Sequence, residues 1–291
     1  MITYVNHRDD STRWPDFELR PGDVVVSTPS KAGTTWLQMI SSLVLNNAPD
    51  LPAPLAETSL WLDSQHNDRD AVFAALAALP GRRVIKTHTP LDGVTLDPDV
   101  TYLAGARHPL DATVSLYHQM GNIDTAEVRR RQGLPAVPEP ARPPLVEWLR
   151  TWIDDEPNPF TAPISLGSVL HHHRDAWARR EDPNVLLVHY ADLSADLTGQ
   201  MRRIASALGV QISPAVLPRL VEAAGFTSMR AHADQLAPRS QSLPLKDRTA
   251  FFRTGRSGAA RDVLTDDDLA RYHASARTQT TPDLFDWLHR P

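Results

Sequence analysis

The stretch STPSKAGTTW, from Ser27 to Trp36, decides how this chain is interpreted. It follows a short β-branched run at 23–26 and precedes apolar residues at helical spacing over 37–45. This pattern predicts a buried strand, a loop and the first turn of a helix. A helix N-terminus presents unpaired backbone N–H groups and a partial positive charge. Lys31 adds a full charge, Gly33 lets the backbone come close, and two threonines add hydroxyl donors. The loop therefore predicts a site for a phosphate-like anion.

The order of residues in this loop differs from the common nucleoside-triphosphate loop, G-x-x-x-x-G-K-[ST]. Lys31 precedes the single glycine of the stretch, Gly33, instead of following it. A lysine in an ordinary turn before a capped helix is the alternative interpretation of these residues alone. The rest of the chain has to decide between the two.

The composition limits the classes of function. The 291 residues are 41% hydrophobic and 22% charged, which is typical of globular proteins and favours one large α/β domain. A net charge of −5 does not indicate a nucleic-acid-binding surface, and no run approaches the roughly 20 apolar residues of a membrane span. The absence of cysteine excludes disulfides and thiol catalysis and favours a cytoplasmic location.

Short apolar runs alternate with helical patterns along the chain. Strands are predicted at 23–28, 83–87, 101–106 and 184–190, and helices at 34–46, 69–79, 109–120, 166–180, 196–208 and 214–224. This order predicts an α/β fold, a single domain at 1–291 with a central parallel sheet flanked by helices. Ligands of such sheets bind beyond the carboxyl ends of the strands. Segments near 125–145 and 235–262 show little periodicity and are expected to be mobile.

Charged residues follow the second and third predicted strands. Lys86 and His88 lie in RVIKTHTPLDG, where a histidine past a strand end could take a proton from a hydroxyl and a lysine could balance developing charge. A surface turn in which His88 bonds the backbone is the alternative. Arg107 ends the third strand and Ser115 lies in the next helix, a pair that could hold a phosphate. Asp111 could instead pair with Arg107.

These segments, taken in order, resemble sulfotransferases that use 3′-phosphoadenosine 5′-phosphosulfate (PAPS). K-x-G-T-T-W resembles their 5′-phosphosulfate loop, IKTHTPLDG their catalytic K-T-H, and R-x-P-x-D-x-x-x-S-x-Y-H their 3′-phosphate segment. HYADL and GFTSMR resemble their adenine segments, and FFRTGRSG resembles their R-K-G-x-x-G loop. SKAGTTW, IKTHTPLDG and LPAPL (51–55) are most similar to mycobacterial-type glycolipid sulfotransferases, which implies an actinobacterial source.

The resemblance implies a P-loop-like sulfotransferase fold and a role for each matching residue. It implies three catalytic residues, His88 as base with Lys31 and Lys86. The implied donor-binding residues are Lys31, Ala32, Gly33, Thr34, Thr35, Trp36, Arg107, Ser115, Tyr190, Phe226, Arg253, Thr254 and Gly255. Trp36 and Phe226 are implied on opposite sides of the adenine. Thr254 replaces the usual lysine and Ala259-Ala260 the usual Asp-Trp; Arg256 could restore the missing charge.

The implied reaction is in-line transfer of a sulfuryl group from PAPS to a hydroxyl, releasing 3′,5′-bisphosphoadenosine without a metal. An atypical P-loop phosphotransferase using ATP and magnesium is an alternative, although the chain lacks the G-K-[ST] order. The other alternative is a non-catalytic PAPS-binding protein, because the loop at 253–260 departs from the family pattern.

The acceptor, a small or lipid-like molecule with a hydroxyl, is left open. Apolar residues over 55–61 with Trp148 and Trp152 could form an acceptor wall or belong to the core. The three adjacent histidines at 171–173 point in different directions on a helix and cannot all bind one metal, but they could lie near the acceptor. The family's C-terminal dimer motif is only faintly echoed over 261–270, so the oligomeric state stays open.

Overall fold

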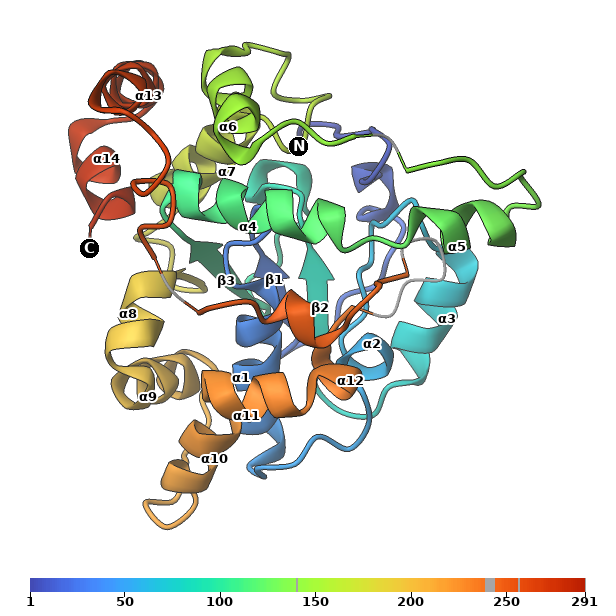
Figure 1. Ribbon diagram of the computed structural model, residues 1–291. Coiled ribbons are helices and arrows are strands. Elements are labelled where there is room, and N and C mark those ends of the chain that lie inside the picture. Colours follow the sequence, from blue (N-terminus) through green and yellow to red (C-terminus); the bar gives the residue numbers. More distant parts are fainter. Residues whose placement is uncertain (140, 239–243, 256, 291) are drawn as a thin grey trace.

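The computed structural model describes residues 1–139, 141–238, 244–255 and 257–290. At the centre of this part of the chain lies a parallel sheet of four strands in the order β2-β1-β3-β4 (Figure 1). The strands are β1 (Val24–Ser27), β2 (Val84–Thr87), β3 (Thr101–Ala106) and β4 (Val185–His189). Each falls within a range that was predicted as a strand. The α/β architecture with a parallel sheet is therefore confirmed.

Both faces of the sheet are covered, which explains why the strand sequences do not alternate between apolar and polar residues. Val24 and Val26 pack with α1 (Thr34–Asn46) and α9 (Leu197–Ala207), whereas Val25 faces the opposite layer. The same first layer contains α10 (Leu217–Ala223), α11 (Phe226–Ala231) and α12 (Ala233–Leu236). The opposite layer contains α3 (Arg69–Ala78) and the N-terminal residues Trp14 and Phe17.

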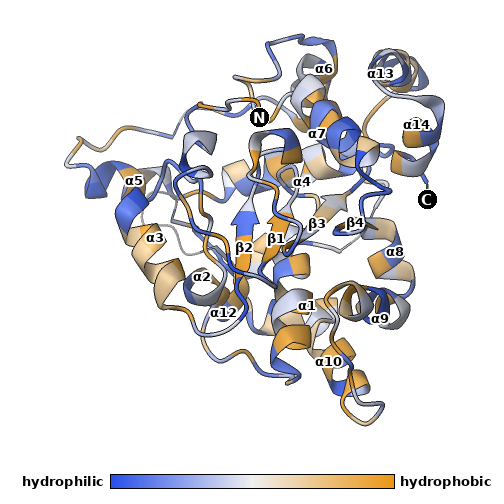
Figure 2. Cartoon of the chain, turned by 180° about the vertical axis from the view of Figure 1, so that it is seen from behind, coloured by the Kyte–Doolittle hydropathy of each residue, from blue (hydrophilic) through white to orange (hydrophobic). Residues whose placement is uncertain are grey.

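A further group of helices packs above the sheet in Figure 1. It is made of α4 (Pro109–Gly121), α6 (Leu145–Asp154), α7 (Leu166–Ala178), α13 (Asp266–Gln279) and α14 (Pro282–Leu288). Their apolar faces form one cluster that continues the core beyond the end of β3. Figure 2 shows the result, with apolar residues concentrated on the strands and on the helix sides toward them.

The long predicted helices α1, α3, α4, α7, α9 and α10 are present, with ends within a few residues of the predicted ones. The helices α6, of 10 residues, and α13, of 14 residues, were not predicted, and neither were α11, α12 and α14. The shortest elements were also missed: α2 (Leu55–Thr58), α5 (Thr125–Arg131), α8 (Tyr190–Ala195) and the 3₁₀ turns η1 (Ser11–Arg13), η2 (Leu91–Gly93) and η3 (Thr249–Phe251). Segments this short carry too few residues to show a period, so their structure depends on tertiary contacts. The mobility expected near 125–145 and 235–262 stays a prediction, and residues 140, 239–243 and 256 of these segments lie outside the described residues.

The carboxyl ends of the strands bring distant parts of the chain together. The loop after β1 leads to Lys31, β2 leads to His88, β3 leads to Arg107, and Tyr190 follows β4. Because the strands are parallel, these four positions share one edge of the sheet. None of the helices in the described ranges combines the length and apolar character that a membrane crossing requires.

Candidate active site

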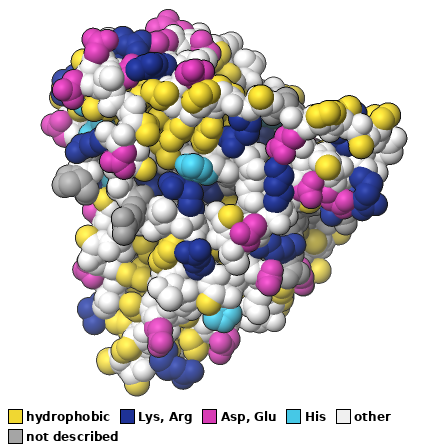
Figure 3. Space-filling view, viewed as in Figure 1, with side chains coloured by type: hydrophobic (Ala, Val, Ile, Leu, Met, Phe, Trp, Pro, Cys, Tyr) yellow, Lys and Arg dark blue, Asp and Glu magenta, His cyan; other side chains and the backbone are white. Residues whose placement is uncertain are grey.

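A cavity of about 360 Å³ opens at the carboxyl edge of the sheet. Its lining includes the following residues that the sequence predicted: Lys31, Gly33, Thr34, Thr35, Trp36, Lys86, His88, Arg107, Ser115, Tyr190, Phe226, Arg253, Thr254 and Gly255. Figure 3 shows Lys and Arg side chains in a hollow near the middle of this face, below a band of hydrophobic ones. None of the described lining residues is Asp or Glu. The cavity therefore has the electrostatic character of an anion site.

The loop before α1 has the backbone geometry of an anion cradle. Gly33 is the N-cap of α1 in the left-handed region, with φ of 97°, and no side chain caps the helix N-terminus. Lys31 also has a positive φ, 66°, which is uncommon for a residue with a side chain and typical of functional loops. The hydroxyl oxygens of Thr28 and Thr34 lie 2.5 Å apart. The first-turn N–H groups of α1 are thus left for a ligand.

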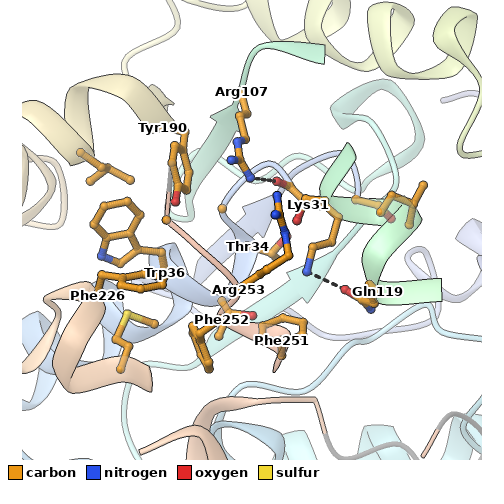
Figure 4. A pocket seen from close by; sticks show the side chains of 18 of the residues that line it. Lys31, Thr34, Trp36, Arg107, Gln119, Tyr190, Phe226, Phe251, Phe252 and Arg253 are labelled. Atoms are coloured by element: carbon orange, nitrogen blue, oxygen red, sulfur yellow. Dashed lines mark hydrogen bonds between the residues drawn. The ribbon is translucent and has the colours of Figure 1, made fainter. Parts of the chain in front are cut away.

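The Lys31 side chain reaches away from its loop to α4 and η3. Its Nζ atom donates to Gln119 Oε1 at 2.6 Å and lies 3.9 Å from the centre of the Phe251 ring. Arg107 donates to the Lys31 carbonyl oxygen at 3.4 Å, as Figure 4 shows. Burial, and then the charges of Arg107 and Lys86, lower the pKa of Lys31 to about 7. An anion at this site would relieve that repulsion.

The ring of His88 is held in one orientation. Its Nδ1 atom lies 2.8 Å from the carbonyl oxygen of Thr28, which can only accept, so Nδ1 carries the proton and Nε2 is the basic atom. The Trp61 ring lies edge-on to it, with centroids 4.7 Å apart. Burial, followed by the charges of Lys86 and Arg8, lowers the pKa of His88 well below its usual value. The imidazole is therefore neutral at neutral pH and able to accept a proton.

Lys86 lies beside this histidine, with Nζ 4.2 Å from the centre of the Trp61 ring. Burial, and then the charge of Arg8, lower the pKa of Lys86 to about 8. Two lysines with lowered pKa values and a neutral histidine thus face one cavity. Clusters of perturbed groups of this kind are typical of catalytic sites.

The opposite end of the cavity combines arginines with aromatic rings. Arg107 lies 4.2 Å from the centre of the Tyr190 ring, and Arg253 points toward the same region in Figure 4. Trp36 meets Tyr190 edge-on at 5.2 Å and donates through Nε1 to the carbonyl of Ala224 at 2.8 Å. This end can accept a flat ring next to an anionic group.

The glycine-containing loop after Phe252 closes over this end. Gly255 has φ of 64°, and a Cβ atom there would come within 2.9 Å of the Phe226 ring, so only glycine fits this approach. The backbone N–H of Gly258 donates to Asp111 Oδ1 at 2.8 Å, which ties the loop to α4. Arg256, which could supply the missing charge, lies outside the described residues.

Comparison with known proteins shows the family to which this chain belongs. A family model described as a sulfotransferase domain matches residues 21–282. Two glycolipid sulfotransferases, from Mycobacterium bovis and Mycobacterium tuberculosis, are each 36% identical to this chain over 99% of it and 94% of their own length. The chain belongs to the sulfotransferase family. The predicted enzyme class is thereby confirmed, and these relatives agree with the narrower, mycobacterial-type resemblance.

The fold of this sulfotransferase is also similar to solved structures of the family. Mouse sulfotransferase SULT7A1, complexed with PAP, matches with a TM-score of 0.67 and 19% identity, over 95% of this chain and 91% of that one. Retinol dehydratase, in complex with androsterone and inactive cofactor PAP, matches with a TM-score of 0.66 and 22% identity, over 94% and 84%. At these identities the likeness supports the fold.

One predicted residue of this sulfotransferase does not line the cavity. Ala32 is 2% exposed and its N–H donates to the carbonyl of Pro29 at 3.3 Å, within the loop. Several lining residues were missed by sequence reasoning, among them Gln119, Phe251 and Phe252. Gln119 lies one helical turn after Ser115 and so shares its face, and the two phenylalanines directly precede Arg253. Helical spacing from Ser115 could have identified Gln119, and adjacency to Arg253 could have identified Phe251 and Phe252.

The sequence left two roles open for the apolar residues at 55–61 and for Trp148 and Trp152, an acceptor wall or the core. The structure separates them into two groups. Leu55 and Trp152 are core residues, 3% and 7% exposed, and Trp148 packs against Tyr117 with ring centroids 5.5 Å apart. None of the three is among the described residues that line the cavity. Trp61, in contrast, contacts both His88 and Lys86. The core interpretation is correct for Leu55 and Trp152.

The three adjacent histidines diverge, as the helical geometry predicted. His171 Nε2 lies 3.0 Å from Asp92 Oδ2, His172 Nε2 lies 3.1 Å from Ser27 Oγ, and His173 is buried near His189 and His289. In the described part of the chain, no group of His, Asp and Glu side chains is arranged to hold a metal ion.

Proposed function

We propose that this sulfotransferase transfers a sulfuryl group from PAPS to a hydroxyl of a lipid-like acceptor, with His88 as the general base. The observation that carries the proposal is the meeting of three groups in one cavity: the uncapped N-terminus of α1, the lysines Lys31 and Lys86, and a neutral His88 whose Nε2 is unprotonated. Sulfuryl transfer needs a site for the anionic donor, positive charge beside the reacting oxygens and a base for the acceptor proton. The α1 N-terminus, the two lysines and His88 would supply these in turn.

Donor binding divides the cavity into three parts. The loop from Lys31 through Ala32 and Gly33 to Thr34 and Thr35 would hold the 5′-phosphosulfate at the α1 N-terminus. Arg107, Ser115, Arg253, Thr254 and Gly255 would hold the 3′-phosphate. Trp36, Tyr190 and Phe226 would pack on the adenine, a contact worth roughly 1–3 kcal/mol per base. All except Ala32 line the cavity, and for Ala32 only a place within the loop is proposed.

In the transfer step, His88 Nε2 takes the proton of the acceptor hydroxyl. The hydroxyl oxygen bonds to sulfur opposite the leaving phosphate oxygen, and the bond between sulfur and that oxygen breaks. Its electron pair goes to 3′,5′-bisphosphoadenosine, where Lys31 and the α1 N-terminus stabilise it. Lys86 balances charge on the sulfuryl oxygens. A sulfuryl group carries less negative charge than a phosphoryl group, so two lysines suffice where phosphoryl transfer uses magnesium.

A lipid-like acceptor is supported by the relatives and by the lining near Lys31. The mycobacterial relatives are glycolipid sulfotransferases. Leu116, Pro238, Phe251 and Phe252 add apolar surface to the cavity. Apolar walls with a few polar groups are usual for small-molecule sites.

The His88→Ala variant tests the base. We expect turnover with labelled PAPS to fall about 10²–10⁴-fold while the Kd of bisphosphoadenosine stays within about threefold. The His232→Ala variant, at an exposed position, is the control and should keep full activity. Near-normal turnover of His88→Ala would exclude His88 as the base. Stronger thermal protection by ATP with magnesium than by the bisphosphate would overturn the donor assignment.

A further inference from the structure

A buried carboxylate lies directly behind the proposed base. Asp63 is 0% exposed and belongs to a segment that runs beside β2, because Lys86 N donates to Leu60 O at 2.9 Å and Leu62 N donates to Lys86 O at 3.2 Å. This pairing sets Asp63 next to the turn that carries His88. No motif in the sequence pointed to it.

One oxygen of Asp63 accepts three hydrogen bonds. Its Oδ2 atom receives Thr87 Oγ1 at 2.7 Å, Thr89 Oγ1 at 2.6 Å and Trp14 Nε1 at 2.9 Å. Thr87 Oγ1 in turn accepts from Thr89 N at 2.9 Å. The two threonines are the residues on either side of His88. Both chain neighbours of the base are therefore held by a single carboxylate oxygen.

The ring of His88 is held from the other side. Nδ1 donates to the Thr28 carbonyl at the end of β1, and Trp61, two residues before Asp63, packs edge-on against the ring. The backbone and the ring of His88 are thus fixed by different segments. A base must lie within hydrogen-bond reach of its proton, and an error of about 1 Å can cost about 10²-fold in rate.

Burying a carboxylate in the core carries a desolvation penalty. Burial, and then the charge of Asp9, raise the pKa of Asp63, while the hydrogen bonds from Thr89, Thr87 and Trp14 oppose that rise. Asp63 Oδ1 is buried without a hydrogen-bond partner in the described part of the protein. A neutral side chain would avoid this cost, so the useful property of Asp63 is its strong acceptor oxygen.

We propose that Asp63 is a positioning residue for sulfuryl transfer, which fixes the hydroxyls of Thr87 and Thr89 and thereby holds His88 with Nε2 as the acceptor in the cavity. The inference rests on the proposed role of His88 as base. Asp63 itself does not line the cavity and touches no reacting atom.

Thr89 offers a test that changes no charge. Thr89→Val removes one hydroxyl from Asp63 at nearly constant volume, and Thr89→Ser keeps that hydroxyl. We expect kcat of Thr89→Val to fall about tenfold or more, with the Kd of bisphosphoadenosine within about threefold, and Thr89→Ser to stay within about twofold of the parent. The kcat of Asp63→Ala should fall about 10²-fold or more. The kcat of Asp63→Asn, which keeps one acceptor oxygen, should lie between those of the parent protein and Asp63→Ala.

A second readout does not depend on catalysis. The His88 imidazole can be titrated by NMR. Burial is the largest cause of its lowered pKa, and the charges that add to the effect, those of Lys86, Arg8 and His172, are the same in both Thr89 variants. A loosened ring gains solvent, so the pKa of His88 should rise toward its ordinary value in Thr89→Val and stay low in Thr89→Ser.

Two results would overturn the inference. One is an unchanged kcat and an unchanged His88 titration in Thr89→Val. The other is a loss of kcat in Thr89→Val that is accompanied by a similar fold-loss of bisphosphate affinity and by a lower unfolding temperature. That combination would assign Asp63 to general stability. Normal turnover of His88→Ala would instead refute the base, while the NMR comparison would still decide whether Asp63 positions the ring.

Discussion

The ammonium group of Lys31 donates to Gln119 Oε1 at 2.6 Å, across the cavity from the loop that carries this lysine. Phe251 covers the same ammonium at 3.9 Å. The lysine proposed to stabilise the leaving group thus contacts both α4 and η3. Gln119 and a donor phosphate are therefore alternative acceptors for the same ammonium group.

Gln119 should therefore compete with the donor for Lys31. Gln119→Leu removes the competing acceptor, and we expect the Kd of bisphosphoadenosine to fall about three- to tenfold, which corresponds to the net value of about 1 kcal/mol for a typical hydrogen bond. Gln119→Glu adds a carboxylate that pairs with Lys31 and repels the anion, so the Kd should rise at least tenfold. Isothermal titration calorimetry measures both. Weaker binding by Gln119→Leu would mean that Gln119 holds Lys31 in place for the donor.

Bisphosphate affinity should depend on pH through Lys31. Its pKa of about 7 means that the amine is charged below pH 7 and mostly neutral at pH 8. The anion binds the charged form, so affinity should decrease from pH 7 to 9, by up to about tenfold per unit. Binding at pH 8 should take up a proton, which calorimetry in buffers of different ionisation enthalpy detects.

Lys31→Arg is the matched control, because a guanidinium stays charged over this range. Its affinity profile should be flatter than that of the parent between pH 7 and 9. Binding without proton uptake at pH 8 in the parent protein would contradict the lowered pKa of Lys31.

Thr254 should be a position where added charge strengthens donor binding. It is exposed, lines the cavity and follows Arg253. Thr254→Lys places a cation beside the proposed 3′-phosphate site, and we expect about fivefold tighter bisphosphate binding at low salt, lost as the ionic strength rises. Thr249→Lys, in η3 and also exposed, is the charge-matched control. Equal gains in both variants would indicate a general charge effect.

The protein should lose stability in mild acid. His172, His173 and His189 are 3%, 2% and 2% exposed, and burial lowers the pKa of His173 to about 3, that of His189 to about 4 and that of His172 well below its usual value. Unfolded histidine titrates near 6.5, so the unfolded state binds more protons below that pH. Stability should fall by about 1.4 kcal/mol per histidine and pH unit.

Urea unfolding at pH 7.5, 6.5 and 5.5 measures this loss. His173→Gln, which cannot titrate, should reduce the slope of stability against pH by about one proton. A stability that stays level from pH 6.5 to 5.5 would show that these histidines are protonated in the folded protein.

The strand, the loop and the start of α1 were predictable because they depend on neighbouring residues. Val24 to Ser27 form a strand and Gly33 precedes a helix that begins at Thr34, as the local pattern indicates. Lys86 and Arg107 were found because polar residues at the carboxyl ends of parallel strands share one edge. The shortest helices and the role of Asp63 were not predictable, because they depend on contacts between segments far apart in sequence. The longer helices α6 and α13 were missed although a local signal was present in α13, the capping box formed by Thr265 and Asp268.

The sequence by itself determined which residues could bind the donor, since their chemistry lies in local motifs at strand ends and at one helix start. The loop from Ser27 to Trp36 is the clearest case. Only the tertiary structure decided which partners these residues contact and how their charges are shifted. Packing brings Gln119 to Lys31, the Thr28 carbonyl to His88 and Asp63 to both neighbours of His88. Desolvation then lowers the pKa values of the lysines and the histidine, and desolvation exists only in the packed chain.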